Sequence, residues 1–200
     1  MSDTHYGHWN ICKHCDRPFS DVHHMNSILT NNHNSIVRPN DNVIHLGDFC
    51  FRGNSADSYI TRLNGNIWFV LGNHDKDLKK FFGDSIMKQF NGKTYRILPA
   101  ESMISIDGQK IVLSHYAMLT WASKHHGNWM LHGHSHYNLK ATQKDGTALG
   151  KILDVGVDGN DFKPYSFDEI FKIMENKPTF PVNDVLNDHH GNINNITIST

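Results

Sequence analysis

Seven side chains of the types that bind metal ions lie in five short segments of the sequence. They are Asp3, His5, Asp48, Asn73, His115, His134 and His136. Two of the segments, D-T-H and H-S-H, place their ligands at positions i and i+2. On an extended or looping backbone, both side chains of such a pair can point at one ion. The mixture of carboxylate, imidazole and amide ligands suits manganese, iron, zinc or nickel better than it suits calcium.

The number of candidate ligands indicates two metal ions. A single zinc ion takes about four ligands, and seven candidates exceed that number. A carboxylate can bridge two ions roughly 3.5–4 Å apart, the separation found in two-metal phosphatases and nucleases. Asp48 is the candidate bridge. The sequence therefore predicts a site for two divalent ions, with manganese favoured and iron, nickel or zinc as alternatives.

The elements that position these ligands are short. Strands are predicted over residues 42–46, 66–71, 103–106, 109–114, 129–132 and 151–155, and helices over residues 21–36, 55–63 and 166–176. Ser20 is the expected cap of the first helix, and Ser166 with Glu169 forms a capping box for the last. Several strands end at a glycine beside Asp, Asn or His. Ligands of α/β sheets bind beyond the carboxyl ends of strands, so the site is expected there.

The ordered motifs resemble those of the calcineurin-like metallophosphoesterase superfamily, D-x-H, G-D, G-N-H-D/E, H and G-H-x-H. The match runs from Asp3 to His136 and fills every motif position. The surrounding segments, such as VIHLGDF and LDVGVDGNDFKP, are similar to a compact bacterial and phage branch of phosphoesterases. The resemblance implies an α/β fold, a four-layer αββα sandwich with the metal ions at its strand ends.

The resemblance also implies a role for each candidate. One ion would be held by Asp3, His5 and His136 and the other by Asn73, His115 and His134, with Asp48 shared. His74 would act as the catalytic acid that protonates the leaving oxygen after attack by a metal-activated hydroxide. Asp75 would orient the imidazole of His74.

One feature departs from the family pattern. A hydrophobic strand normally runs into the D-x-H motif, but only two residues precede Asp3, and two residues are too few for an ordinary strand. The first strand is therefore expected to be missing or truncated. Residues 192–199, with isoleucines at 193, 196 and 198, are a possible substitute. We expect Asp3 and His5 to be less firmly held than the other ligands.

Several other residues allow either a functional or a structural interpretation. Arg17 and Arg52 are candidates for binding substrate phosphate, because guanidinium pairs bidentately with it, and a structural role weighs equally for both.

Cys12 and Cys15 form a CxxC, which favours a loop over a zinc knuckle because no second CxxC exists. His8 and His132 flank the motifs and are candidates for supporting the ligands or contacting substrate.

Composition bounds the class of protein. Residues 1–200 suit one domain, with about 178–200 as a flexible or accessory tail. The 19 basic and 20 acidic residues produce no global field that would attract nucleic acid or a membrane. Three cysteines argue against a disulfide framework, and no signal peptide or membrane span is visible. We therefore expect a cytoplasmic protein. Its 16 histidines raise the expectation of metal chemistry.

Three functions remain open from the sequence. Compact size and near-neutral charge favour a phosphodiesterase acting on a small nucleotide or cyclic nucleotide, and a phosphodiesterase is preferred to a phosphomonoesterase. A nuclease is the alternative within the superfamily, although clustered Lys and Arg are scarce. A binding scaffold that no longer catalyses is the alternative from another class. The sequence does not indicate an oligomeric state.

Overall fold

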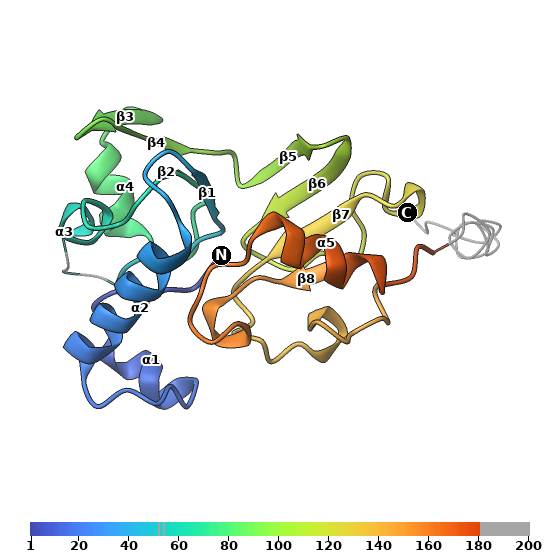
Figure 1. Ribbon diagram of the computed structural model, residues 1–200, viewed down its shortest axis with the longest axis horizontal. Helices are drawn as coiled ribbons and strands as arrows, with labels where there is room; N and C mark the ends of the chain where they lie inside the picture. Colours follow the sequence, from blue (N-terminus) through green and yellow to red (C-terminus); the bar gives the residue numbers. More distant parts are fainter. Residues whose placement is uncertain (52, 54, 181–200) are drawn as a thin grey trace, which may run out of the picture.

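Two four-stranded sheets form the centre of the molecule (Figure 1). The computed structural model describes residues 1–51, 53 and 55–180. The first sheet, in the order β1-β2-β4-β3, contains β1 (Asn42–His45), β2 (Asn66–Phe69), β3 (Met87–Phe90) and β4 (Lys93–Ile97). The second, in the order β5-β6-β7-β8, contains β5 (Glu101–Ile106), β6 (Gln109–Ser114), β7 (Trp129–His132) and β8 (Ile152–Asp154).

Strand direction gathers the candidate ligands. β1, β2 and β4 run parallel, as do β6, β7 and β8, while β3 and β5 are antiparallel to their neighbours. The carboxyl ends of β1 and β2 therefore lie at one edge of the first sheet, and those of β6 and β7 at one edge of the second. Four of the five ligand motifs, all but D-T-H, follow these four ends.

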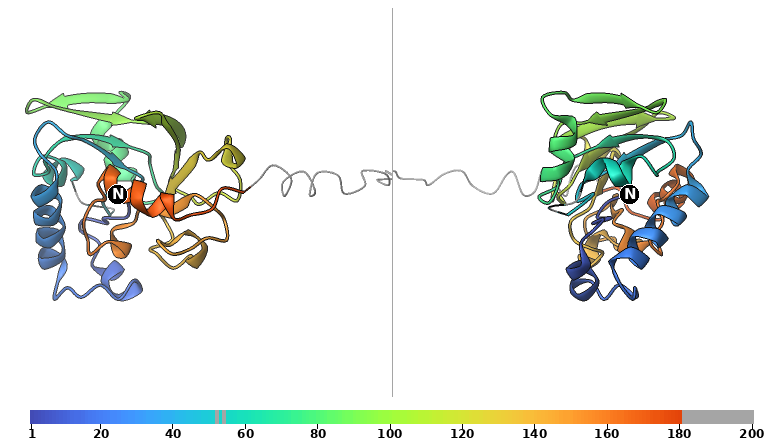
Figure 2. Two further views of the ribbon diagram at one scale, coloured as in Figure 1. Left: turned by 45° about the vertical axis from the view of Figure 1, so that its right-hand side comes forward. Right: turned by 90° about the vertical axis from the view of Figure 1, so that its left-hand side faces the viewer.

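The helices differ in how they cover the sheets. They are α1 (Trp9–His14), α2 (Val22–Ile36), α3 (Ala56–Ile60), α4 (Lys76–Phe82) and α5 (Phe167–Glu175), with 3-10 turns η1 (Lys124–His126), η2 (Lys140–Thr142) and η3 (Val157–Gly159). Residues of α2, α3 and α4, including Met25, Ile60 and Leu78, join Val43 and Ile67 of the first sheet in one core. Figure 2 shows α2 on the side away from the second sheet.

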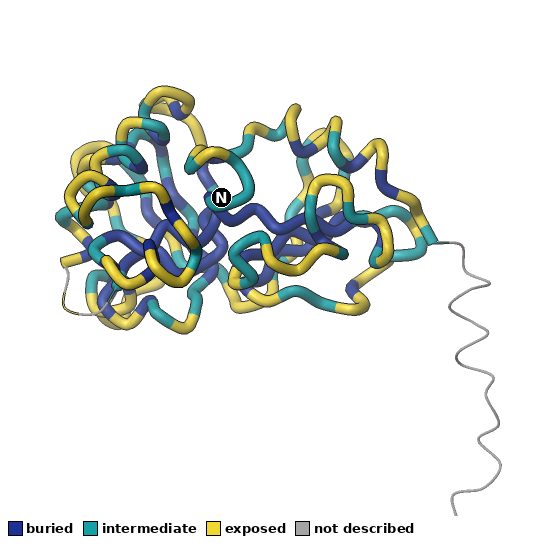
Figure 3. The backbone as a smooth tube through the Cα atoms, turned by 90° about the horizontal axis from the view of Figure 1, so that it is seen from below, coloured by how far each residue is buried: buried dark blue, intermediate teal, exposed yellow. Residues whose placement is uncertain are grey.

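The second core lies between the sheets and beneath α5. Leu113 and Leu131 of the second sheet share it with Leu46, just after β1, and with Ile170 of α5. The opposite face of the second sheet carries Val112, Met130 and Ile152, which pack on Trp121 and neighbouring loop residues. The α/β sandwich is confirmed, although α5 packs on the inner face of the second sheet rather than over its outer face. Figure 3 shows buried segments running through the interior.

The predicted elements are largely present. The 109–114 and 129–132 strands match β6 and β7, and the capping box of Ser166 and Glu169 is present at the start of α5. The cap of α2 is Asp21 rather than Ser20, because the Asp21 carboxylate accepts a hydrogen bond from the His24 amide. A helix, α1, stands where a loop was predicted, and the sequence patterns did not indicate α4, β3 or β4.

The N-terminal segment lies between the two sheets and has partners on both sides. On one side the Leu46 amide donates to Met1 and the Asp3 amide donates to Gly47, at 2.9 and 3.0 Å. On the other side Ser2 pairs in parallel with Gly156 as an isolated bridge. Within the described residues, this isolated bridge is the β pairing recorded immediately before Asp3. The proposed substitute at 192–199 lies outside them.

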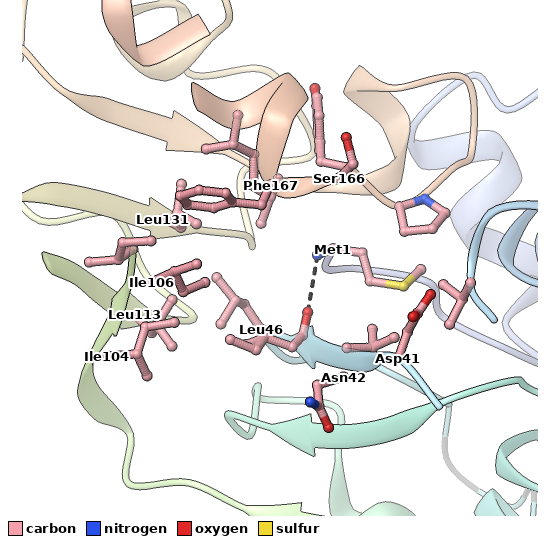
Figure 4. Close-up of a pocket in the computed structure, with 18 of the residues that line it drawn as sticks. Met1, Asp41, Asn42, Leu46, Ile104, Ile106, Leu113, Leu131, Ser166 and Phe167 are labelled. Carbon is pink, nitrogen blue, oxygen red and sulfur yellow. Dashed lines mark hydrogen bonds between the residues drawn. The ribbon is translucent and has the colours of Figure 1, made fainter. Parts of the chain in front are cut away.

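An apolar cavity of about 450 Å³ remains between the sheets, beside Met1 and the start of α5 (Figure 4). Its walls include Leu46, Ile104, Leu113 and Phe167. None of the seven candidate metal ligands is among its lining residues. Within residues 1–51, 53 and 55–180, no helix is long and apolar enough to cross a membrane.

Candidate metal centre

Five of the seven candidate ligands have left-handed backbone conformations. Their φ angles are +58° at Asp3, +51° at His5, +56° at Asp48, +67° at His134 and +46° at His136. Each such residue costs roughly 1–2 kcal/mol when it is not glycine. Strained backbone that persists in a folded protein clusters at functional sites. These motifs thus form tight turns that bring their side chains into two groups.

Asp3, His5 and His136 form the first of two groups, with one ligand atom from each lying within 4.8 Å of the others. One oxygen of the Asp3 carboxylate accepts a hydrogen bond from the His134 amide at 2.9 Å. Its other oxygen, Oδ1, and the Nε2 atom of His5 are buried with no hydrogen-bond partner among the residues described. Unpaired buried polar atoms are costly, and a cation between them would satisfy both.

The second group is Asp48, His115 and His134. The Nδ1–H of His115 donates to the Leu46 carbonyl at 2.7 Å, which leaves the lone pair of Nε2 available. Nε2 lies 3.2 Å from the side-chain oxygen of Asn73. The side-chain oxygen of Asn73, a predicted amide ligand, therefore lies beside this group.

Asp48 connects the two groups. Its Oδ1 accepts a hydrogen bond from the His74 amide at 2.8 Å. Its Oδ2 lies 3.5 Å from Nε2 of His5 and 3.6 Å from Nε2 of His115. One carboxylate oxygen thus faces a member of each group, which is the position required of a bridging ligand. The donor set fits two divalent cations.

Burial shapes the protonation of the first group. Burial lowers the pKa of His5 well below its usual value and so favours the neutral imidazole, the form that binds metal. Burial also raises the pKa of Asp3 to about 8, against the opposing effect of His136. A cation beside Asp3 would favour its ionised form.

The structure places Asp3 and His5 as firmly as the other ligands. Both are buried, and the His5 amide donates to the Asp48 carbonyl at 3.0 Å. Backbone hydrogen bonds to the segment after β1 thus hold both residues, in contrast to the expectation that they are loosely held.

His74 and Asp75 follow Asn73 and have separate tasks. The ring of His74 lies 5.2 Å from that of His5, between centroids, and belongs to neither ligand group. The Asp75 carboxylate accepts hydrogen bonds from the amides of Asp48, Phe49 and Gly72 at 2.7–2.8 Å. Asp75 was expected to orient the His74 imidazole. Its oxygens instead join the turn after β1 to the turn after β2.

The remaining candidates take supporting positions. The Arg17 side chain is buried and donates hydrogen bonds to Asp158 and to two backbone carbonyls, so a structural role accounts for it. Arg52 lies outside the described residues. His8 contacts His5 and stacks on Phe51, and buried His132 donates to the Gly133 carbonyl.

The CxxC does not form a knuckle in the described part of the chain. Cys12 faces Met25 in the core, with the two sulfur atoms 3.5 Å apart. Cys15 instead groups with His136 and Asp158.

Three residues near the site were not identified from the sequence. Asp158 accepts a hydrogen bond from Nδ1 of His136 at 2.9 Å, and Asp154 accepts one from the Tyr137 amide at 2.8 Å. Exposed Tyr116 donates to Asn73 and packs against His134. The two aspartates lie in the segment LDVGVDGNDFKP, whose likeness to the family was the one available signal.

Comparisons with known proteins show the family to which the chain belongs. The crystal structure of a protein of unknown function from Aquifex aeolicus is similar, with a TM-score of 0.62 and 28% identity, covering 86% of this chain and 96% of that one. An uncharacterized protein of Methanocaldococcus jannaschii is 34% identical over 189 residues, which cover 92% of this chain and 96% of that protein. Residues 18–153 match the model of the calcineurin-like phosphoesterase superfamily domain. The chain therefore belongs to the calcineurin-like phosphoesterase superfamily.

Proposed function

We propose that this protein is a phosphodiesterase that uses two divalent metal ions and acts on a small nucleotide or cyclic nucleotide. The observation that carries the proposal is the position of Asp48 Oδ2, 3.5 Å from His5 and 3.6 Å from His115. This position would join the two ligand groups into one dinuclear site. Manganese is the favoured ion, with iron, nickel and zinc as alternatives.

Each part of the site would have a defined task. When bound, the two ions would activate water for attack on phosphorus and offset charge on the phosphoryl oxygens. His74 is held through its amide by Asp48, and its ring faces the site without joining a ligand group. That position suits a side chain that gives a proton to the leaving oxygen. Asp75 keeps the two ligand turns together through three amide hydrogen bonds.

The position of Arg17 supports the preference for a diester. A phosphomonoester carries up to two negative charges near neutral pH, whereas a diester carries one. The guanidinium of Arg17 is buried and already paired with Asp158, so it is not available to bind a phosphoryl group. The weaker demand of a diester for cationic side chains fits this arrangement better.

The test is a substrate panel with purified protein. Mono- and bis-(4-nitrophenyl) phosphate, cyclic mononucleotides and single-stranded DNA would each be assayed with added manganese, iron, nickel or zinc. We expect hydrolysis of the aryl diester and of a nucleotide diester, and its loss in Asp48→Asn, which keeps the side-chain shape but removes its charge. Stronger activity on DNA with steep salt dependence would favour the nuclease. No hydrolysis with any metal would favour the binding scaffold.

A further inference from the structure

A buried ion pair lies directly behind the first ligand group. The Nε and Nη2 atoms of Arg17 donate to the two carboxylate oxygens of Asp158, at 2.7 and 2.9 Å. The side-chain exposures are 0% for Arg17 and 8% for Asp158, so solvent screens the pair weakly. The two residues are 141 positions apart in the chain. This bidentate geometry is the strongest form of guanidinium–carboxylate contact.

The carboxylate end of the pair contacts a candidate ligand. Asp158 Oδ2 lies 2.9 Å from Nδ1 of His136, and this oxygen can only accept the hydrogen. Holding the hydrogen on Nδ1 leaves the lone pair on Nε2, which lies 4.0 Å from Asp3 Oδ1. Histidines that bind metal commonly use their second nitrogen in this way.

The guanidinium end contacts the other arm of the same group. Nη2 donates to the Asp3 carbonyl at 2.7 Å, and Nη1 donates to the Thr4 carbonyl at 3.1 Å. These carbonyls belong to the backbone turn in which Asp3 and His5 have positive φ angles. One guanidinium therefore holds the D-T-H segment by its backbone and the H-S-H segment through Asp158.

A third metal site is the competing interpretation of this cluster. Cys15, His136 and Asp158 have ligand-type atoms within 4.8 Å of one another. Both oxygens of Asp158 already accept hydrogen bonds from Arg17, and one also faces His136. A cation at this point would meet the guanidinium charge, so the contacts favour a supporting network.

We propose that Arg17 and Asp158 are positioning residues that assemble the first metal site from its two halves. The inference rests on the proposed dinuclear function and deepens it. It assigns to the pair control over the ion held by Asp3, His5 and His136 and leaves the ion beside Asn73 and His115 independent of it. Loss of an outer hydrogen-bond partner of this kind lowers metal affinity by about 10–100-fold.

The test is titration of the metal-free full chain with cobalt(II), followed by visible absorbance and by metal content after gel filtration. We expect the wild type to bind two ions. Asp158→Leu should lose about 10–100-fold in affinity for one ion and keep the other. Asp158→Asn retains an acceptor oxygen, so its affinity for that ion should lie between those of the wild type and Asp158→Leu. Arg17→Lys should weaken binding of the same ion.

Reference variants identify which ion is lost. The cobalt spectrum that remains in Asp158→Leu should match that of His136→Ala and differ from that of His115→Ala. Lys177→Gln is the matched control, because Lys177 is also a buried cation bound to two backbone carbonyls, those of Gln143 and Gly146. It lies outside both ligand groups and should keep both ions.

The outcomes separate the two proposals. A wild-type chain that binds no cobalt would overturn the dinuclear site and this inference with it. Two ions in the wild type with unchanged affinities in Asp158→Leu would overturn the inference alone. Equal losses at both ions, or an equal loss in Lys177→Gln, would show general destabilisation and would also overturn it. Loss of a third ion on changing Cys15→Ser would favour the competing metal site.

Discussion

At the scale of single residues, the two aspartates of the site divide their oxygens in the same way. Asp3 binds the His134 amide with Oδ2, and Asp48 binds the His74 amide with Oδ1. In each, the other oxygen faces the ligand groups. These hydrogen bonds to backbone amides thus orient both carboxylates toward the ligand groups. Such preorganisation reduces the ordering cost of binding.

The role of general acid proposed for His74 depends on a single imidazole ring. His74→Gln should slow hydrolysis of alkyl or nucleoside diesters by roughly 100-fold or more, since these leaving groups need a proton. Nitrophenyl esters leave without much protonation and should lose less than about 10-fold. The measurement is kcat/KM for both ester classes under identical metal loading. Cobalt stoichiometry should stay unchanged. Equal losses on both classes would rule out His74 as the acid.

At the scale of elements, the turns after strands determine the site. Gly47 follows β1 with φ +96°, and a Cβ atom there would lie 2.5 Å from His115 Nδ1 and 2.7 Å from the Gly72 amide. The turn after β1 therefore lies against the ligand following β6 and the turn after β2. A side chain at position 47 would separate elements that the site must bring together.

Gly47→Ala should accordingly destabilise the protein and weaken metal binding. Positive φ costs an alanine roughly 1–2 kcal/mol, and the steric contact adds about 1–3 kcal/mol. Gly108→Ala is the matched control, because Gly108 has φ +82° but nothing within 4 Å of the added Cβ. Urea unfolding should show the larger loss at position 47, and cobalt affinity should fall there alone. Similar losses in the two variants would contradict the steric argument.

The capping box of α5 offers a prediction without a metal effect. Ser166 accepts a hydrogen bond from the Glu169 amide, and Glu169 accepts one from the Ser166 amide at 2.7 Å. Ser166→Ala should cost about 1 kcal/mol of the free energy of unfolding. Because α5 carries none of the candidate ligands, cobalt affinity should be unchanged in the same sample. A loss of cobalt would mean that α5 supports the site.

At the scale of the whole molecule, the candidate ions would join two halves. Asp48 and Asn73 follow strands of the first sheet, and His115 and His134 follow strands of the second. The N-terminal segment with Asp3 lies between them and is hydrogen-bonded to both sides. Ions held by these ligands would cross-link the sheets, so metal binding and folding stability should be coupled.

Removal of metal should therefore lower the melting temperature. An ion present at about 100 times its Kd stabilises a folded protein by roughly 2.7 kcal/mol. Chelated protein should melt earlier by calorimetry, and added manganese should restore the wild-type value. Asp48→Asn removes the negative charge at the point where the two ligand groups meet. Manganese should therefore raise the melting temperature of this variant by less than that of the wild type. A melting temperature that does not respond to any divalent ion would contradict the site.

Several strands and helices could be predicted from the sequence because short local patterns specify them. The period of apolar residues, the glycines at strand ends and the S-x-x-E capping box all act over a few residues. They predicted β6, β7 and α5 correctly. β3 was missed because it is short and its sequence, MKQF, has no regular alternation of apolar and polar residues. Three of its four residues are exposed, so no buried face imposes such a pattern. α1 was missed because it has only six residues and its first turn lacks a capping side chain.

The sequence by itself determined which side chains are available for metal chemistry and which family the motifs resemble. Residue types and spacings of two or three positions carry that information. Only the tertiary structure decided that Asp3 is firmly anchored, that Asp75 holds backbone amides, and that Arg17 faces Asp158 across 141 positions. Contacts between residues so far apart depend on how sheets and turns pack, and no local pattern specifies them.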